Sequence, residues 1–177
     1  MTQKLILFIS LIAMVQAFTI FDFNKKADIT NWKIVDDVVM GGRSSGKFYL
    51  SEEGNGVFEG KVSLENNGGF SSLRYRFDAV STTSYSKIIL KVKGDGKSYQ
   101  FRVKDKTSNY YSYITYFNSS TGWKTIEINL SDMYPAFRGR KLNSPNYNSE
   151  RIEELAILIG NKKEETFKLE IDSIVLE

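Results

Sequence analysis

The stretch Ser98-Tyr99-Gln100-Phe101-Arg102-Val103-Lys104 alternates apolar and polar side chains without a break. Tyr99, Phe101 and Val103 would point to one side of an extended chain, and Gln100, Arg102 and Lys104 to the other. This period of two is typical of a half-buried strand in an antiparallel sheet. The same alternation returns in "WKTIEINL" at 123–130 and in "TFKLEIDSIVLE" at 166–177. The three stretches together predict an all-β protein.

Further short strands are expected before and between these three. They are predicted at 19–23, 32–35, 47–50, 57–64, 70–77 and 155–160. The Gly-rich "SEEGNG" at 51–56 predicts a hairpin, and Gly94-Asp95-Gly96 predicts a second one between the strands beside it. A short helical turn is expected at Ser149–Glu154, where Ser149 could act as the cap. Short, evenly spaced strands predict a single-domain β-sandwich or jelly roll.

The composition excludes several kinds of chemistry. The chain has no histidine and no cysteine, which rules out a Ser-His-Asp triad, a cysteine nucleophile, a disulfide and the usual zinc and haem ligands. Asp36 and Asp37 would point to opposite faces of a strand, so they form no glycosidase-like pair. We therefore expect a protein that is not an enzyme and needs no cofactor. Asp22 and Asp172 could help to bind a structural Ca²⁺ together with loop carbonyls.

The first residues have the pattern of a secretory signal. Lys4 precedes an apolar run at 5–15, and Val15-Gln16-Ala17 places small residues before a cleavage point. This pattern predicts a signal peptide at 1–17 and a folded domain at 18–177, exported to the periplasm or outside if the source is bacterial, with no membrane span after cleavage. An uncleaved anchor or a buried N-terminal strand is the alternative. The formal charge of +3 is too small to indicate nucleic acid binding.

The segment "VVMGGRSSG" at 38–46 could be either a phosphate loop or a tight bend. A phosphate loop needs a helix after it, whereas a strand is expected to follow here. A bend with glycines at close backbone approaches fits better, and the same holds for "NNGGF" at 66–70. Arg43 and Arg74 accompany the two glycine pairs. With Asp37 they would form either a polar binding surface or merely exposed charges.

The segment "NYYSYITYF" at 109–117 is dense in aromatic residues. Tyr111, Tyr113 and Phe117 share one face of the expected strand, and Tyr110 and Tyr116 share the other. One face must pack in the core. The other could serve as a stacking platform for sugar or for the apolar surface of a partner, or could simply pack across strands.

Several blocks, taken in order, resemble the complex I intermediate-associated protein 30 family. They are "NWKIVDDVVMGGRSSG", "GVFEGKVSLENNGGFSSLRYRF", "YQFRVKD", "YSYITYF", "GWKTIEINLSDMYPAFRGRKLN" and "ELAILIGNKKEETFKLEIDSIVLE". The resemblance runs from about Trp32 to the C-terminus. It implies a galactose-binding-like β-sandwich and a chaperone-like role in the assembly of NADH:ubiquinone oxidoreductase. The positions that match the family motifs are Asp37, Met40, Gly41, Gly42, Arg43, Ser44, Gly60, Gly68, Gly69, Phe70, Arg74, Trp123, Phe137, Arg138 and Gly139.

The sequence therefore supports two functional hypotheses. The first is a non-catalytic protein-binding module whose partners are respiratory-complex assembly intermediates, with a surface at 40–44, 68–74 and 137–140. The second is an exported carbohydrate-binding module that stacks sugar on Tyr110, Tyr116 or Trp123. Arg74 or Asp37 would form hydrogen bonds with the sugar hydroxyls. An exposed coplanar aromatic pair in a groove would favour carbohydrate, and an apolar patch with a polar rim would favour a protein. The candidate binding residues are Asp37, Met40, Arg43, Ser44, Phe70, Arg74, Tyr110, Trp123 and Arg138.

Overall fold

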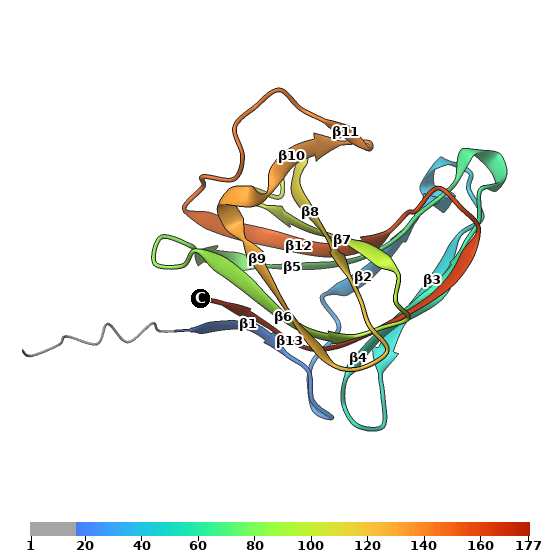
Figure 1. Cartoon of the computed structure of the whole chain (residues 1–177), viewed down its shortest axis with the longest axis horizontal. Coiled ribbons are helices and arrows are strands. Elements are labelled where there is room, and N and C mark those ends of the chain that lie inside the picture. The colour runs from blue at the N-terminus through green and yellow to red at the C-terminus, as the bar shows by residue number, and fades with distance from the viewer. Residues whose placement is uncertain (1–16) are drawn as a thin grey trace, which may run out of the picture.

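The computed structural model describes residues 17–177 as two antiparallel sheets packed face to face (Figure 1). The first sheet has the order β3 (Ser45–Leu50), β4 (Gly56–Val62), β13 (Glu165–Leu176), β6 (Lys87–Lys93) and β9 (Lys124–Asn129), and β1 (Phe18–Asp22) pairs with the second half of β13. The second sheet has the order β11 (Arg140–Lys141), β10 (Tyr134–Phe137), β8 (Ser112–Asn118), β7 (Ser98–Lys104), β12 (Arg151–Ile159), β5 (Ser71–Ser81) and β2 (Trp32–Asp36). The predicted all-β sandwich is confirmed.

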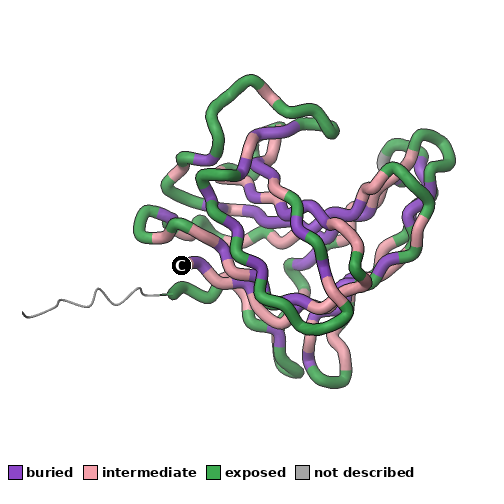
Figure 2. The backbone as a smooth tube through the Cα atoms, viewed as in Figure 1, coloured by how far each residue is buried: buried purple, intermediate pink, exposed green. Residues whose placement is uncertain are grey.

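The apolar faces of the alternating strands meet between the sheets. Tyr99, Phe101 and Val103 of β7 are buried against the first sheet, as the alternation predicted. Figure 2 shows the same pattern, with buried stretches on the facing strands and exposed backbone at the turns. The phases predicted for β9 and β13 are also confirmed. The largest fully buried side chains are Tyr99, Phe58, Phe101, Leu73, Ile88, Leu90, Met133, Ile152, Leu155, Ile157, Ile159 and Leu169.

The predicted hairpin at Gly94-Asp95-Gly96 is wrong. β6 belongs to the first sheet and β7 to the second, so this turn carries the chain from one sheet to the other. The Asp95 carboxylate accepts hydrogen bonds from the backbone N–H of Lys97 and of Lys168 and from the Tyr99 hydroxyl. Turn residues specify a local bend, but they do not specify which strands pair on its two sides.

The helical turn predicted at Ser149–Glu154 is also wrong, because β12 begins at Arg151. β12 pairs with β5 on one side and with β7 on the other. Ile152 and Leu155 are both fully buried, and the pairing of β12 with β5 has a β-bulge between Ile152 and Glu154 that shifts the register between them. Pairing along both edges and burial of these side chains outweigh the local preference of Ser149 for a helix cap.

Three short 3₁₀ helices lie among the strands: η1 (Asp37–Met40), η2 (Glu65–Asn67) and η3 (Leu130–Asp132). Within residues 17–177, no helix has the length and hydropathy needed to span a membrane. The predicted signal peptide falls on residues outside those that the structure describes, apart from its last position.

The Asp37 carboxylate holds together two loops that are distant in sequence. It accepts hydrogen bonds from the backbone N–H and the hydroxyl of Ser44 at 2.9 and 2.5 Å, and from the backbone N–H groups of Gly69 and Phe70 at 2.5 and 3.1 Å. Asp37 and Ser44 are both buried. The prediction that these two side chains belong to a binding surface is therefore corrected. They lie beneath the surface and connect the η1 loop to the segment that follows η2.

The glycines beside this carboxylate leave room for it. A Cβ atom on Gly42 would overlap the Asp37 carboxylate, and one on Gly68 would lie 2.6 Å from its Oδ2 atom. Gly41 has a different role, because its backbone is in the left-handed region with φ +90° and ends η1. The glycine-rich bend predicted from "VVMGGRSSG" is confirmed, and its physical reason is a buried carboxylate that needs close backbone donors.

We expect Gly42→Ala to lower the free energy of unfolding by roughly 2–4 kcal/mol, because the new methyl group displaces the Asp37 carboxylate from its donors. Urea unfolding would measure the change. Gly122→Ala is the matched control, since no atom lies within 4 Å of a Cβ there and the change should stay within about 0.5 kcal/mol. Equal stability of the two variants would contradict the proposed packing.

Asp37 should also give the fold a pH dependence. Burial acts to raise the pKa of this carboxyl, but its hydrogen bonds from Ser44, Gly69 and Phe70 outweigh burial and hold the pKa below the ordinary value. Its contribution to stability is then present above about pH 4 and is lost as the pH falls through the lowered pKa. We expect Asp37→Asn to cost about 2–4 kcal/mol at neutral pH.

The difference in unfolding free energy between the wild type and Asp37→Asn should shrink as the pH is lowered below about 4. Urea titrations at several pH values would measure it. A difference that stays constant across the acid range would show that the charge on Asp37 does not stabilise the fold.

Candidate functional site

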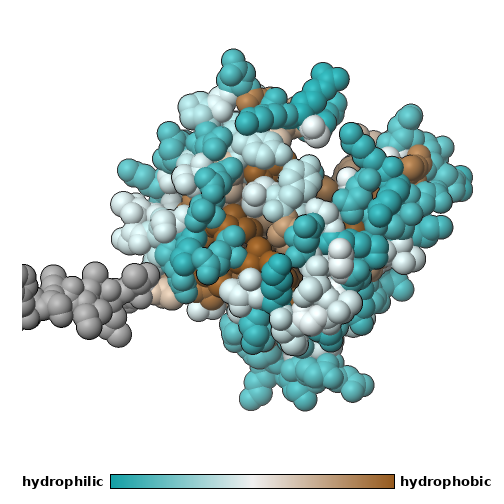
Figure 3. All heavy atoms as spheres, in the orientation of Figure 1, coloured by the Kyte–Doolittle hydropathy of each residue, from teal (hydrophilic) through white to brown (hydrophobic). Residues whose placement is uncertain are grey.

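A groove runs across the outer face of the seven-stranded sheet, between two projecting arms. One arm is the β10–β11 hairpin, and the other consists of the loops around η1 and η2. Figure 3 shows the molecule hollowed between these arms. The groove has a volume of about 460 Å³ and is lined by Val35, Met40, Gly69, Phe70, Arg74, Gln100, Arg102, Lys104, Tyr110, Ser112, Ala136, Phe137, Arg138, Gly139, Glu154, Ala156, Leu158 and Gly160.

The floor of the groove consists of rows of side chains on neighbouring strands. Ala156 of β12 lies opposite Arg74 of β5 on one side and opposite Arg102 of β7 on the other. In the rows beside it, Leu158 lies opposite Gln100, and Glu154 lies opposite Lys104. The polar face of "SYQFRVK" is therefore the floor of the groove, and its apolar face is core.

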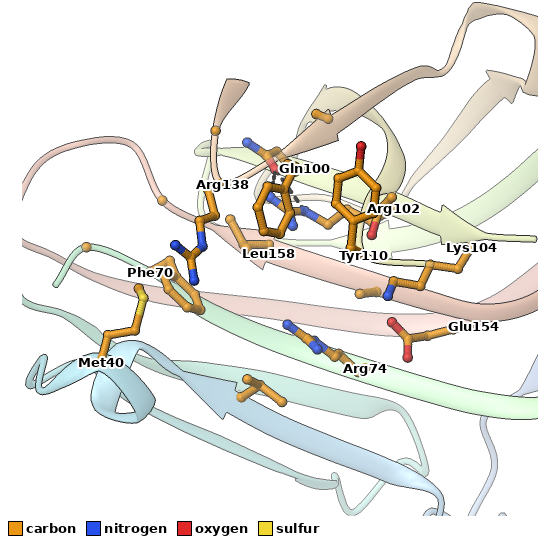
Figure 4. A pocket seen from close by; sticks show the side chains of 18 residues that line it. Met40, Phe70, Arg74, Gln100, Arg102, Lys104, Tyr110, Arg138, Glu154 and Leu158 are labelled. Atoms are coloured by element: carbon orange, nitrogen blue, oxygen red, sulfur yellow. Dashed lines mark hydrogen bonds between the residues drawn. The ribbon is translucent and has the colours of Figure 1, made fainter. Parts of the chain in front are cut away.

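The walls of the groove are largely apolar. Met40, which is 58% exposed, and Phe70 come from the η1–η2 arm. Tyr110 and Phe137 stand on the other side, with ring centroids 5.1 Å apart and planes at 85°. Arg138 sits in the hairpin turn and points from one arm toward Phe70 and Met40 (Figure 4).

The turn that carries Arg138 has an unusual backbone. Arg138 has φ 47° and Gly139 has φ 76°, and these two residues join Phe137 to Arg140. Positive φ at both central residues is the requirement of a type I′ hairpin turn. The turn therefore sets the position of Arg138 over the groove.

Cations outnumber carboxylates in the groove. Arg74, Arg102, Lys104 and Arg138 line it, against the single carboxylate of Glu154. Glu154 is buried and already accepts a hydrogen bond from Arg76 Nε at 2.6 Å. The groove is therefore a positively charged site with apolar walls.

Arg102 is the most strongly perturbed of these cations. Its Nε and Nη2 atoms donate to Oε1 of Gln100 at 2.9 and 2.6 Å, so its acceptor is a neutral amide. Burial, together with the positive charge of Arg74, lowers the pKa of Arg102 to about 10. Burial and the charges of Arg74 and Arg76 lower the pKa of Lys104 as well, although Glu154 opposes this. With a pKa of about 10, Arg102 remains charged at neutral pH, and its hydrogen-bond acceptor carries no negative charge.

The structure brings five of the predicted site residues into one groove and separates the others from it. Arg43 lies outside, where its Nη1 atom is 3.2 Å from Oε2 of Glu65 and both side chains are exposed. Trp123 lies on the other sheet, beside a smaller cavity and with Lys91 Nζ 5.8 Å from its ring centroid. The five residues in the groove are Met40, Phe70, Arg74, Tyr110 and Arg138.

The sequence patterns did not identify Arg102, Lys104 and Glu154 as part of the site. The alternation in "SYQFRVK" did place Arg102 and Lys104 on the face away from the core. It could not show that this face is concave, because the arms that enclose it come from distant segments. Glu154 was missed because it was assigned to a helical turn.

The aromatic residues of the groove do not form a coplanar pair. Tyr110 and Phe137 meet edge to face, and the exposed Tyr116 accepts a hydrogen bond at its hydroxyl from Gln100 Nε2 at 2.6 Å. The stacked aromatic pairs found within residues 17–177 lie outside the groove: Trp32–Tyr75, Tyr75–Phe77 and Tyr99–Phe117.

The Ca²⁺ site suggested at Asp22 and Asp172 stays a prediction. Asp172 lies with Oδ2 at 3.3 Å from Lys91 Nζ, and it accepts a hydrogen bond from the Ser173 hydroxyl. Among the described residues, no group of three or more carboxylates has the geometry to hold a metal ion.

The two packed sheets define a jelly-roll β-sandwich, a fold that is also found in carbohydrate-binding modules. A family 11 carbohydrate-binding module from Clostridium thermocellum, solved with a β-1,3-1,4-mixed-linked tetrasaccharide, superposes with a TM-score of 0.69 at 19% identity, covering 90% of this chain and 94% of that one. The family 11 module of the cellulase Lic26A-Cel5E gives a TM-score of 0.70 at 18% identity, covering 92% and 94%. At this identity the likeness shows the fold alone.

The chain belongs to the complex I intermediate-associated protein 30 family, whose model matches residues 21–171. The family member of Drosophila melanogaster is 25% identical over 89% of this chain and 62% of its own length. The mouse protein is 22% identical over 92% and 57%, and a probable member from Caenorhabditis briggsae is 27% identical over 87% and 52%. The chain thus spans between half and two thirds of the length of these relatives.

The prediction that the protein is exported is wrong. The relatives from fly, mouse and nematode are all named as mitochondrial proteins. The apolar N-terminal run, interpreted as a secretory signal, is a weak indicator of destination because it depends on local hydropathy alone.

The charges of the groove should cost stability. We expect Arg74→Gln to leave the free energy of unfolding unchanged or to raise it by up to about 1 kcal/mol, because it removes repulsion with Arg102. Arg76→Gln, two residues along the same strand, is the matched control. It should lower stability by roughly 1–3 kcal/mol, because it leaves the buried Glu154 carboxylate without Arg76. Urea unfolding of both variants would measure this, and an equal loss in the two would contradict it.

Proposed function

We propose that this protein is a non-catalytic, chaperone-like binding factor that acts in mitochondria on assembly intermediates of complex I, and that it holds a protein partner in the groove. The observation that carries the proposal is a groove with apolar walls and a cationic floor in a member of this family. Met40, Phe70 and Phe137 offer apolar contact area, and the surrounding cations add electrostatic selectivity.

The chemistry of the groove supports a binding role rather than catalysis. Glu154 is the one carboxylate among its lining residues, and it is held by Arg76. A carboxylate held by an arginine is poorly suited to general base chemistry, and the chain has neither histidine nor cysteine to take that role.

Carbohydrate binding is the weaker alternative. It draws on the fold that this chain shares with the family 11 modules. The residues expected to serve it are dispersed: Trp123 lies on the other sheet, Asp37 is buried, and Tyr110 meets Phe137 edge to face. A platform for flat stacking on sugar rings would need coplanar exposed aromatics.

Disruption of the gene in its own organism tests the proposal. We expect the amount of fully assembled complex I on native gels of isolated mitochondria to fall severalfold, with complexes III and IV unchanged as internal controls. A tagged copy of the chain should restore complex I and co-migrate with its smaller intermediates. Normal complex I after disruption would overturn the proposal.

A further inference from the structure

We propose that the groove selects its partner by a carboxylate, the side chain of an Asp or Glu flanked by apolar residues in an extended segment, seated between Arg74 and Arg102 above Ala156. The inference rests on the proposed function in one respect, namely that the ligand is a protein.

The register of three strands creates the seat. Ala156 lies directly opposite both Arg74 and Arg102, on the strands to either side of it. Neighbouring strands lie about 4.8 Å apart, so the two arginine Cα atoms are separated by roughly 10 Å. Ala156 fills little of the space between them, because its side chain is a single methyl group. An arriving carboxylate could therefore accept hydrogen bonds from both guanidinium groups.

The seat lacks a negative charge of its own. In the part of the chain that the structure describes, Arg74 forms no ion pair, and the acceptor for Arg102 is the neutral Gln100 amide. Glu154 is nearby but is held by Arg76. The planar guanidinium fork matches a carboxylate in geometry, so two adjacent uncompensated arginines favour an anion of this kind.

The walls favour a polypeptide as the source of that anion. Met40 and Phe70 on one arm rise beside the cationic floor, and Phe137 of the other arm does so together with Tyr110 of the β7–β8 loop. An acidic side chain with apolar neighbours would place its charge on the floor and its neighbours against the walls. A flat anionic membrane would instead need the cations at the rim, and a neutral sugar would leave both arginines uncompensated.

Selection from a random-peptide library displayed on phage tests the proposal, with the immobilised chain as bait. The matched control bait is Ala156→Glu, which should place a carboxylate of the protein itself between the two arginines while keeping a cooperative thermal transition. We expect the wild type to enrich peptides with Asp or Glu beside apolar residues, and Ala156→Glu to enrich none of them.

The enriched peptide is then synthesised, labelled and titrated by fluorescence anisotropy. We expect Arg74→Gln, Arg102→Gln and replacement of the peptide's acidic residue by its amide each to weaken binding about tenfold or more. Arg43→Gln is the control for charge, because it removes an exposed arginine outside the groove; it should change the affinity less than about twofold. Added salt should weaken binding of the wild type.

Several results would overturn the proposal. They are enrichment of peptides without an acidic residue, equal enrichment on the Ala156→Glu bait, no enrichment at all, or an unchanged affinity in Arg74→Gln. Sedimentation with vesicles that contain an anionic phospholipid tests whether the site binds a membrane instead. If the wild-type chain sediments with the vesicles, Arg74→Gln does not, and no peptide is selected, the site binds lipid.

The two proposals fail in different experiments. If gene disruption reduces complex I and the Arg74→Gln chain restores it fully, the assembly role stands and the carboxylate seat does not serve it. If acidic peptides bind as expected but complex I is normal after disruption, the seat stands and the assembly role is wrong.

Discussion

The buried carboxylate of Asp37 is the constraint on which the geometry of the site depends. A buried carboxylate is costly unless hydrogen-bond donors surround it, and here Ser44, Gly69 and Phe70 supply them. Ser44 follows η1, whereas Gly69 and Phe70 follow η2, more than twenty residues later. One charged group therefore fixes the two loops of one arm against each other. It requires glycine at positions 42 and 68, since a side chain there would occupy the space of the carboxylate.

The Asp37 carboxylate also positions two residues in the wall of the groove. Met40 ends η1, and Phe70 donates its backbone N–H to Asp37, so both wall residues are positioned by the same carboxylate. The opposite wall depends on a separate device, the turn at Arg138 and Gly139 with positive φ. Two arms thus face each other across the sheet, one held by the hydrogen bonds of Asp37 and the other by the turn at Arg138 and Gly139. Rigid walls reduce the ordering cost of binding, because they are already in place before a partner arrives.

Whereas the hydrogen-bonded Asp37 carboxylate stabilises the fold, the two arginines in the floor of the groove oppose folding. Arg74 and Arg102 raise the electrostatic energy of the folded state, and the lowered pKa of Arg102 reflects both its burial and this repulsion. Nothing in the packing of the core requires either charge. Residues that oppose folding in this way are characteristic of sites used for recognition. The same fold holds sugar in a family 11 module, so the function of this member depends on the residues placed on the sheet and its arms rather than on the sandwich.

The sequence by itself determined the class of the fold, the faces of the main strands and the family. The alternation at Tyr99, Phe101 and Val103 was sufficient to identify core and surface, because side-chain direction in a strand follows directly from the period of two. Five of the candidate residues were found from their motifs and do line the groove. Only the tertiary structure decided which strands pair, that the chain changes sheets at Asp95, and that Ser149–Glu154 leads into a central strand. It also decided that Asp37 is buried, that Trp123 lies on the other sheet, and that Arg102 and Lys104 share a concave floor with Arg74. The physical reason is that strand pairing and concavity arise from contacts between segments far apart in the chain, and such contacts leave little mark on any local pattern of residues.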